Sequence, residues 1–196
     1  MRRAEQKEKR REEIIFVALD LFVHKGYAAT KIQDIAEAVG MSVGLLFHYF
    51  ESKEKLYEEL IRIGAASPQN FLGSIESEPL MFFRTIAGEF FRSLKTEPFV
   101  AKLFVFMKQT QYNAAAPESV KTLLTGYDIT VLLIKKIKQG QRNGTIKEGD
   151  PLALALAFWK AVAGIAEHIA LTPNAPIPES EWVVDILRNN KPKNNL

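Results

Sequence analysis

The stretch that decides the fold spans residues 30–55, TKIQDIAEAVGMSVGLLFHYFESKEK. Its first apolar residues recur with the spacing of one helix face, and they are Ile32, Ile35, Ala36 and Val39. Thr30 is predicted to cap this helix through its hydroxyl, and Gln33, three residues on, would complete a capping box. Gly40 is predicted to end the helix, because glycine takes a positive φ at no steric cost.

A second short helix is predicted over residues 42–50, about two and a half turns long, with Ser42 as its cap. Leu46 and Phe50 fall on one side of it, whereas Gly44, Leu45, His48 and Tyr49 fall on the other. Ser52 would cap a third helix that begins at Lys53. Two short helices joined by a tight turn form a helix-turn-helix, whose second helix lies in a DNA major groove.

The run GYAATKIQDIAEAVGMSVGLLFHYFESKEKLY, residues 26–57, resembles the DNA-binding module of TetR-family transcriptional regulators. The resemblance covers about residues 10–60 and includes the helix that ends at Lys25-Gly26-Tyr27. It implies phosphate contacts for Thr30, Tyr49 and Lys53. The full set that it implies at the DNA is Thr30, Lys31, Ser42, Val43, Gly44, Leu45, Phe47, His48, Tyr49 and Lys53. The alternative is local: Thr30 and Ser42 act only as caps, and Lys53 is a solvated lysine.

Three positions of the second helix depart from the family pattern. The family often has a polar residue at 43, Thr or Ser at 45, and Tyr at 47, where this chain has Val43, Leu45 and Phe47. The loss of hydroxyl groups favours apolar contacts with the thymine methyl group over hydrogen bonds to base edges. His48 is the main polar side chain left on this helix.

Composition sets bounds on the compartment and on the charge. The chain has 196 residues, a formal net charge of +3 and no cysteine, which suits a reducing cytoplasm. The charged N-terminus lacks the apolar core of a signal peptide, and no apolar run reaches a membrane span. We therefore expect a cytoplasmic protein with no membrane partner. The basic residues 1–11 are predicted either to form an arm that contacts DNA or to be a frayed helix start.

The rest of the chain predicts an all-α fold of about nine helices, cut by proline and glycine. The predicted helices span residues 12–25, 30–39, 42–50, 52–66, 80–94, 99–112, 117–140, 151–171 and 179–190. Asp150 is a predicted N-cap, and Pro68 is predicted to block regular continuation of the fourth helix. The predicted domains are a DNA-binding domain over 1–55 and an effector-binding and dimerisation domain over 56–196.

Phenylalanine is concentrated between residues 71 and 106, which indicates either a packed core or the lining of an apolar pocket. The resemblance favours an effector pocket in this domain, since TetR-family proteins typically carry one. The predicted pocket residues are Phe82, Phe83, Phe90, Phe104, Met107, Tyr112, Tyr127, Trp159 and His168.

Small residues recur on several faces of the helix predicted over 151–171, which would let another helix approach closely. In the resembled family the last two helices pair with their twofold mates. The predicted dimer contacts are Ala163, Gly164, Trp182, Val183, Ile186 and Leu187. Packing within one chain is the alternative.

No enzyme is predicted, because His24, His48 and His168 have no metal-ligand spacing and no phosphate-binding loop is present. No catalytic residue, metal or cofactor is expected. The sequence predicts a homodimeric repressor that binds a palindromic operator in double-stranded DNA and is released by a small, apolar effector. An activator, or a small-molecule binding protein of this fold without regulated repression, is the alternative.

Overall fold

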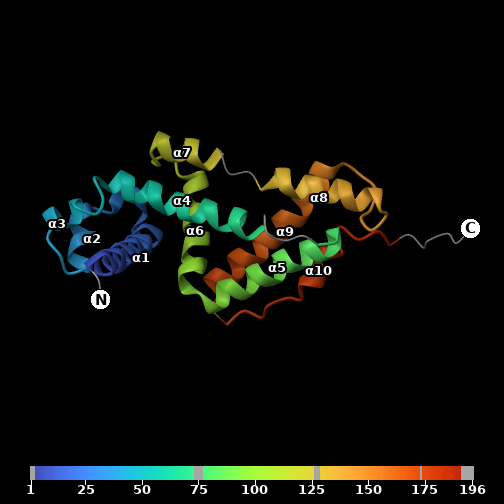
Figure 1. Cartoon of the computed structure of the whole chain (residues 1–196), viewed down its shortest axis with the longest axis horizontal. Coiled ribbons are helices and arrows are strands. Elements are labelled where there is room, and N and C mark those ends of the chain that lie inside the picture. Colours follow the sequence, from blue (N-terminus) through green and yellow to red (C-terminus); the bar gives the residue numbers. More distant parts are fainter. Residues whose placement is uncertain (1–2, 73–76, 126–128, 173, 191–196) are drawn as a thin grey trace, which may run out of the picture. The chain divides into compact units, whose positions relative to one another are not determined.

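The computed structural model describes residues 3–72, 77–125, 129–172 and 174–190, and these residues form ten α-helices (Figure 1). Within the described residues, Ile146 and Arg188 also form one isolated antiparallel β-bridge. The predicted all-α fold is confirmed, with one helix more than expected. The helices are α1 (Arg3–Ala29), α2 (Ile32–Ala38), α3 (Val43–Phe47), α4 (Lys53–Leu72), α5 (Pro79–Thr96), α6 (Pro98–Tyr112), α7 (Glu118–Thr125), α8 (Thr130–Arg142), α9 (Pro151–Leu171) and α10 (Ser180–Val184).

The chain divides into two compact units, and neither is continuous in sequence. The first contains Met1–Ser67 and Phe99–Tyr127, and the second contains Pro68–Pro98 and Asp128–Leu196. The predicted domain boundary after residue 55 therefore does not coincide with the edge of a compact unit. The first unit adds most of α4, with α6 and α7, to the three N-terminal helices. The functional division at 55 stays a prediction.

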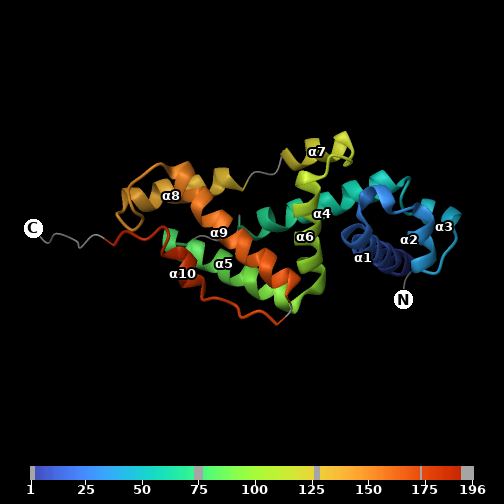
Figure 2. The ribbon, with the colours of Figure 1, turned by 180° about the vertical axis from the view of Figure 1, so that it is seen from behind.

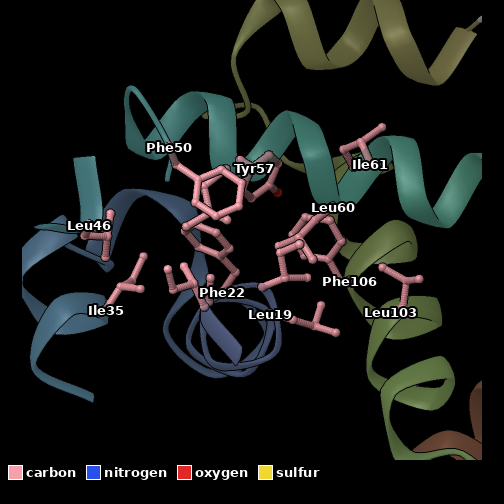
Figure 3. Packing of buried hydrophobic residues seen from close by; sticks show 14 of the residues in the cluster. Leu19, Phe22, Ile35, Leu46, Phe50, Tyr57, Leu60, Ile61, Leu103 and Phe106 are labelled. Carbon is pink, nitrogen blue, oxygen red and sulfur yellow. The ribbon is translucent and has the colours of Figure 1, made fainter. Parts of the chain in front are cut away.

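The core of the first unit lies where α1, α2, α3, α4 and α6 bury one apolar face each (Figure 3). The stripe predicted on α1 supplies Leu19 and Phe22, which are buried against Leu60 of α4 and Phe106 of α6. Two arginines of α1 form polar contacts with the neighbouring helices α2 and α4. Arg10 donates to the Val39 carbonyl at the end of α2 (2.7 Å), and Arg11 forms a 2.5 Å ion pair with Glu59 of α4.

The second unit packs α5, α8, α9 and α10, and both views place α9 beside α5 and α8 (Figure 1 and Figure 2). Its core is rich in aromatic rings. The Phe83 ring meets the Phe82 ring edge-on at 5.4 Å and the Phe158 ring of α9 at 4.8 Å. α9 is long and apolar enough to cross a membrane by length and composition alone. Its Phe158, Val162 and neighbouring residues are buried inside this unit, as in the core helix of a globular fold.

Several predicted helix ends are confirmed at the level of single hydrogen bonds. The Ser42 hydroxyl accepts from the Leu45 amide at 3.2 Å, and the Ser52 hydroxyl accepts from the Lys55 amide at 3.1 Å. The Asp150 carboxylate accepts from the Ala153 amide at 2.8 Å. Gly40 has the positive φ, 65°, that a turn after α2 requires.

The predicted cap of α2 is wrong. The N-cap is Lys31, and its amide donates to the carboxylate of Asp34 at 3.2 Å. Thr30 lies one residue too early, and its hydroxyl donates instead to the Gly26 carbonyl at 2.7 Å. Gln33 is exposed and does not complete a capping box.

Four predicted helix limits also differ. α1 begins at Arg3, so the basic N-terminus is helical where described, and it kinks at Gly26 (φ 78°) before ending at Ala29. α4 continues through Pro68 to Leu72. The helix predicted over 117–140 is present as α7 and α8, separated by residues 126–128, which lie outside the described part. The last helix ends at Val184, because residues 187–189 instead pair with 145–147: Lys147 donates to the Leu187 carbonyl at 2.9 Å.

Candidate DNA-binding surface

α3 is held by one face and exposes the other. Leu46 and Phe50 are buried in the first unit's core, as the sequence predicted. On the outer face Leu45 and Phe47 are each 44% exposed, and Gly44 and His48 are exposed as well. Two large apolar side chains are thus exposed on a helix of five residues, where they are available for a contact. The predicted DNA-facing side of α3 is therefore free to make one.

Val43 and Tyr49 differ from the other predicted DNA residues of α3, because both are half-buried and pack against the core. Ser42 is exposed but its hydroxyl is engaged as the cap of α3. The side chains with most freedom to reach a base are therefore Leu45, Phe47 and His48.

A shallow hollow of about 340 Å³ lies beside α3. It is lined by Ala28, Thr30, Lys31, Ile32, Gln33, Phe47, Ser52 and Lys53. The hollow brings the predicted residues Lys31, Phe47 and Lys53 around one space, although they come from three different helix ends. Gln33 also lines it and was assigned only a capping role from the sequence. Its exposure on the first turn of α2 is the signal that points to a polar contact.

Thr30 is fully buried, with 0% of its surface exposed. Its hydroxyl donates to the Gly26 carbonyl, so it joins the start of α2 to the kink of α1. The hydroxyl is buried and already has an acceptor in this conformation. In this conformation the Thr30 side chain has a structural role, and its phosphate contact stays a prediction.

Lys53 is half-buried, and its ammonium already has hydrogen-bond partners. Its ammonium donates to the carbonyls of Tyr27 (2.7 Å) and Thr30 (2.8 Å) and lies over the Tyr27 ring. Partial burial lowers the pKa of Lys53 from its ordinary value. In this conformation the ammonium satisfies backbone oxygens at the end of α1, where the helix dipole is negative. A phosphate contact by Lys53 stays a prediction.

The predicted effector residues fall in both units. Phe104, Met107 and Tyr112 belong to α6 of the first unit, and Tyr112 lines a hollow of about 500 Å³ with Lys121 and Leu124. In the second unit Phe82 and Phe83 are fully buried in the core, Phe90 stacks on Trp159, and His168 is exposed. Tyr127 lies outside the described residues. The core alternative holds for Phe82 and Phe83, and the pocket stays a prediction.

The predicted dimer residues separate into two groups. Ala163, Val183 and Leu187 are buried within their own chain, and Ile186 is half-buried. Intrachain packing, the alternative, therefore accounts for the buried three in this structure. Gly164 and Trp182 are exposed and remain available to a partner. Among the described residues no cluster of His, Asp and Glu could hold a metal ion.

The fold and this surface define a helix-turn-helix protein. Residues 14–60 match the family model described as bacterial regulatory proteins, tetR family. The HTH-type transcriptional repressor KstR2 of Rhodococcus jostii is 43% identical over 53 residues, which cover 27% of this chain and 26% of that relative. The matched stretch is thus about a quarter of the length of this curated relative.

Two solved structures extend the similarity beyond the helix-turn-helix. The MbdR regulator from Azoarcus sp. has a TM-score of 0.76 at 19% identity, covering 93% of this chain and 98% of that one. AibR in complex with isovaleryl coenzyme A and operator DNA has a TM-score of 0.66 at 18% identity, covering 90% and 94%. These similarities establish the shared fold over most of the chain. The resemblance to the TetR family of bacterial regulatory proteins is thus confirmed over residues 14–60, the helix-turn-helix part of the chain.

Proposed function

We propose that this protein is a transcriptional repressor that binds a palindromic operator as a homodimer and leaves it when a small, apolar effector binds. One observation carries the DNA-binding part of the proposal. α3 is capped by Ser42, anchored by Leu46 and Phe50, and exposes Leu45, Phe47 and His48 within the matched residues 14–60. A short helix that is anchored by one face and exposed on the other can lie in a DNA major groove and contact base edges.

The operator contacts divide by chemistry. Lys31 and Gln33, exposed at the start of α2, supply polar groups at a helix N-terminus, where backbone amides favour phosphate. The outer face of α3 supplies the contacts to bases. A twofold dimer would place two copies of α3 about one DNA turn apart or a multiple, near 34–36 Å, so the operator is palindromic. Action on DNA places the protein in the cytoplasm.

The effector part rests on aromatic side chains that are not closed into the core. Phe90 and Trp159 stack at 6.2 Å and are both half-buried, so an apolar compound could pack beside them. Two proteins of similar fold support this: AibR was solved in complex with isovaleryl coenzyme A and operator DNA, and KstR2 of Mycobacterium tuberculosis is described as a ketosteroid transcriptional regulator. To release DNA, the effector must bind the non-binding arrangement more tightly.

Fluorescence anisotropy with labelled DNA from the protein's own upstream region tests the proposal. The full chain should bind with two copies per site, and its Leu45→Ala and His48→Ala variants should bind more weakly. Met81→Ala, an exposed apolar position on α5, is the matched control and should bind like the wild type. In vitro transcription from that promoter should fall when the protein is added. Increased transcription would identify an activator, and absence of sequence-specific binding would contradict the proposal.

A further inference from the structure

α3, the helix that exposes Leu45 and Phe47, is too short for its direction to be set by its own packing alone. It has five residues, and Leu46 is the one that lies fully in the core (Figure 3). A helix of little more than one turn that is held at one buried side chain could tilt about that contact. The direction of α3 therefore depends on what fixes the chain just before it and just after it.

The turn before α3 receives one of its hydrogen bonds from α1. The amides of Gly40 and Met41 donate to carbonyls in the last turn of α2, at 3.0 and 2.9 Å, which is the pattern of a Schellman motif. The carbonyl of Val39, the C-cap of α2, is not part of that pattern, and it accepts from the Arg10 guanidinium at 2.7 Å. Another nitrogen of Arg10 pairs with Glu13 at 2.6 Å, which holds the guanidinium in this orientation. Arg10 thereby fixes the point at which the chain leaves α2 for α3.

The chain after α3 is held by the next residue of α1. The guanidinium carbon of Arg11 lies 5.2 Å from the centre of the Phe50 ring, and Phe50 is buried just beyond the end of α3. The same guanidinium forms a 2.5 Å ion pair with Glu59 of α4. A planar guanidinium can stack on a ring and pair with a carboxylate at the same time. Arg11 therefore connects the end of α3 to both α1 and α4.

We propose that Arg10 and Arg11 are positioning residues that set the direction of α3 and thereby the sequence preference of the protein, without binding DNA themselves. Arg10 acts through the turn before α3, and Arg11 acts through Phe50 after it. Because the two arginines are consecutive, a single turn of α1 holds both ends of the recognition helix. The inference rests on the DNA binding proposed above and names the residues that make it selective.

This assignment divides the basic N-terminus into two parts. Arg3, Lys7 and Lys9 are exposed on the first turns of α1, whereas Arg10 and Arg11 are half-buried and donate to protein oxygens. A side chain that contacts phosphate strengthens binding to every sequence, because the backbone charge is the same everywhere. A side chain that positions α3 strengthens binding only to the sequence that α3 reads. The two roles therefore differ in what they do to discrimination between DNA sequences.

Fluorescence anisotropy of the full-length protein with two DNA duplexes tests the proposal. One is the upstream fragment that the wild type binds, and the other is a shuffled duplex of the same length and composition, each titrated at several salt concentrations. Arg10→Ala and Arg11→Ala should each lower the ratio of the two affinities about tenfold, the effect of one misplaced base contact. Affinity for the shuffled duplex and its salt dependence should not change. Partial unfolding would reduce both affinities by the same factor, so the ratio does not respond to lost stability alone.

Conservative variants separate geometry from charge. Arg10→Lys should recover most of the ratio, because an ammonium can still donate one hydrogen bond to the Val39 carbonyl. Arg11→Lys should not recover it, because lysine has no planar group that stacks and pairs together. Glu59→Gln removes a negative charge and so cannot weaken phosphate binding, yet it should lower the ratio because Arg11 loses its ion-pair partner. Lys9→Ala, at an exposed position of α1, is the charge-matched control and should leave the ratio unchanged.

The possible outcomes are distinct. Equal losses on both duplexes, with the salt dependence reduced by about one counterion, would make the arginines phosphate contacts and overturn the positioning role. Variants that discriminate as well as the wild type would also overturn it and would leave the proposed function intact. A wild type that binds both duplexes equally would overturn the proposed function and this inference together.

Discussion

The ammonium of Lys53 lies 4.1 Å from the centre of the Tyr27 ring and donates a 2.7 Å hydrogen bond to the Tyr27 carbonyl. A second bond, of 2.8 Å, reaches the carbonyl of Thr30. These oxygens lie where α1 ends and the connection to α2 begins, and so lack helical partners of their own. The first turn of α4 thereby fixes the segment that leads into the helix-turn-helix.

Lys53→Ala is therefore expected to lower the free energy of unfolding by about 1–3 kcal/mol, because it leaves partly buried carbonyls without a donor. Urea denaturation of the full chain measures this. Lys31→Ala is the matched control, since Lys31 is exposed in the same hollow. It should leave stability unchanged and reduce the salt dependence of DNA binding by about one counterion. If Lys53→Ala instead changes only the salt dependence, Lys53 is a phosphate contact.

The hydroxyl of Tyr57 joins α4 to α6 within the first unit. It lies 2.7 Å from the hydroxyl of Thr110, which itself donates to the Phe106 carbonyl, so the tyrosine is the donor between them. Burial raises the pKa of Tyr57. Tyr57→Phe should lower the free energy of unfolding by about 1 kcal/mol. Thr110→Val should lower it further, because the buried Tyr57 hydroxyl loses its acceptor. A double-mutant cycle by urea denaturation should show strong non-additivity. Simple additivity would mean that the hydroxyls do not interact.

Glu58 of α4 is a buried carboxylate whose pKa is held below its usual value of 4.5, chiefly by a 2.9 Å hydrogen bond from Lys55. Because the pKa is lower in the folded state, this carboxylate contributes stability above about pH 4.5 that is lost as pH falls through the folded-state pKa. Glu58→Gln should therefore lose less unfolding free energy than the wild type between pH 6 and pH 3. Glu12→Gln, at an exposed position of α1, should follow the wild type. Parallel curves for Glu58→Gln and the wild type would contradict this linkage.

Trp159 gives an optical test of the effector, because it stacks on Phe90 and is half-buried, whereas Trp182 is exposed. In a Trp182→Phe background, an apolar compound that packs beside Trp159 should change its emission and release labelled operator DNA at the same concentrations. Probes are isovaleryl coenzyme A, a long-chain fatty acid and a steroid. The Trp159→Phe variant, which retains only Trp182, is the control and should not respond. The pocket loses its support if no probe alters Trp159 and native mass spectrometry of the purified protein finds no bound compound.

Features set by neighbouring residues were predictable from the sequence. Gly40 and the Ser42, Ser52 and Asp150 caps depend on contacts within a few residues, and the burial of Leu46 and Phe50 follows from helical periodicity. The outward direction of Leu45 and His48 follows from the same periodicity. For this reason the fold class and the outer face of α3 could be predicted from the sequence.

Features set by distant residues were not predictable. Lys53 donates to the carbonyls of Tyr27 and Thr30, which lie 26 and 23 positions earlier, and no local sequence pattern indicates that contact. The last helix stops at Val184 because the following residues pair with 145–147, a pairing that overrides helical propensity. Val183 and Leu187 look equally suited to a core and to a dimer, and only packing decides that they are buried in their own chain.

The recognition helix should discriminate bases by apolar contact. Leu45 and Phe47 are its most exposed large side chains, whereas Val43 packs partly on the core, so Leu45 is the best placed to meet a thymine methyl group. Replacing the thymine that it faces by uracil deletes only that methyl and should weaken binding by about 0.8 kcal/mol, the value of one buried CH₂. Leu45→Ala should remove most of this discrimination. It should not change the salt dependence, because no phosphate contact is lost. Fluorescence anisotropy with singly substituted operators measures each effect, and uracil at positions outside the half-sites is the control. If uracil throughout the half-site leaves the affinity unchanged, methyl contacts do not determine sequence preference, and DNA shape must supply it.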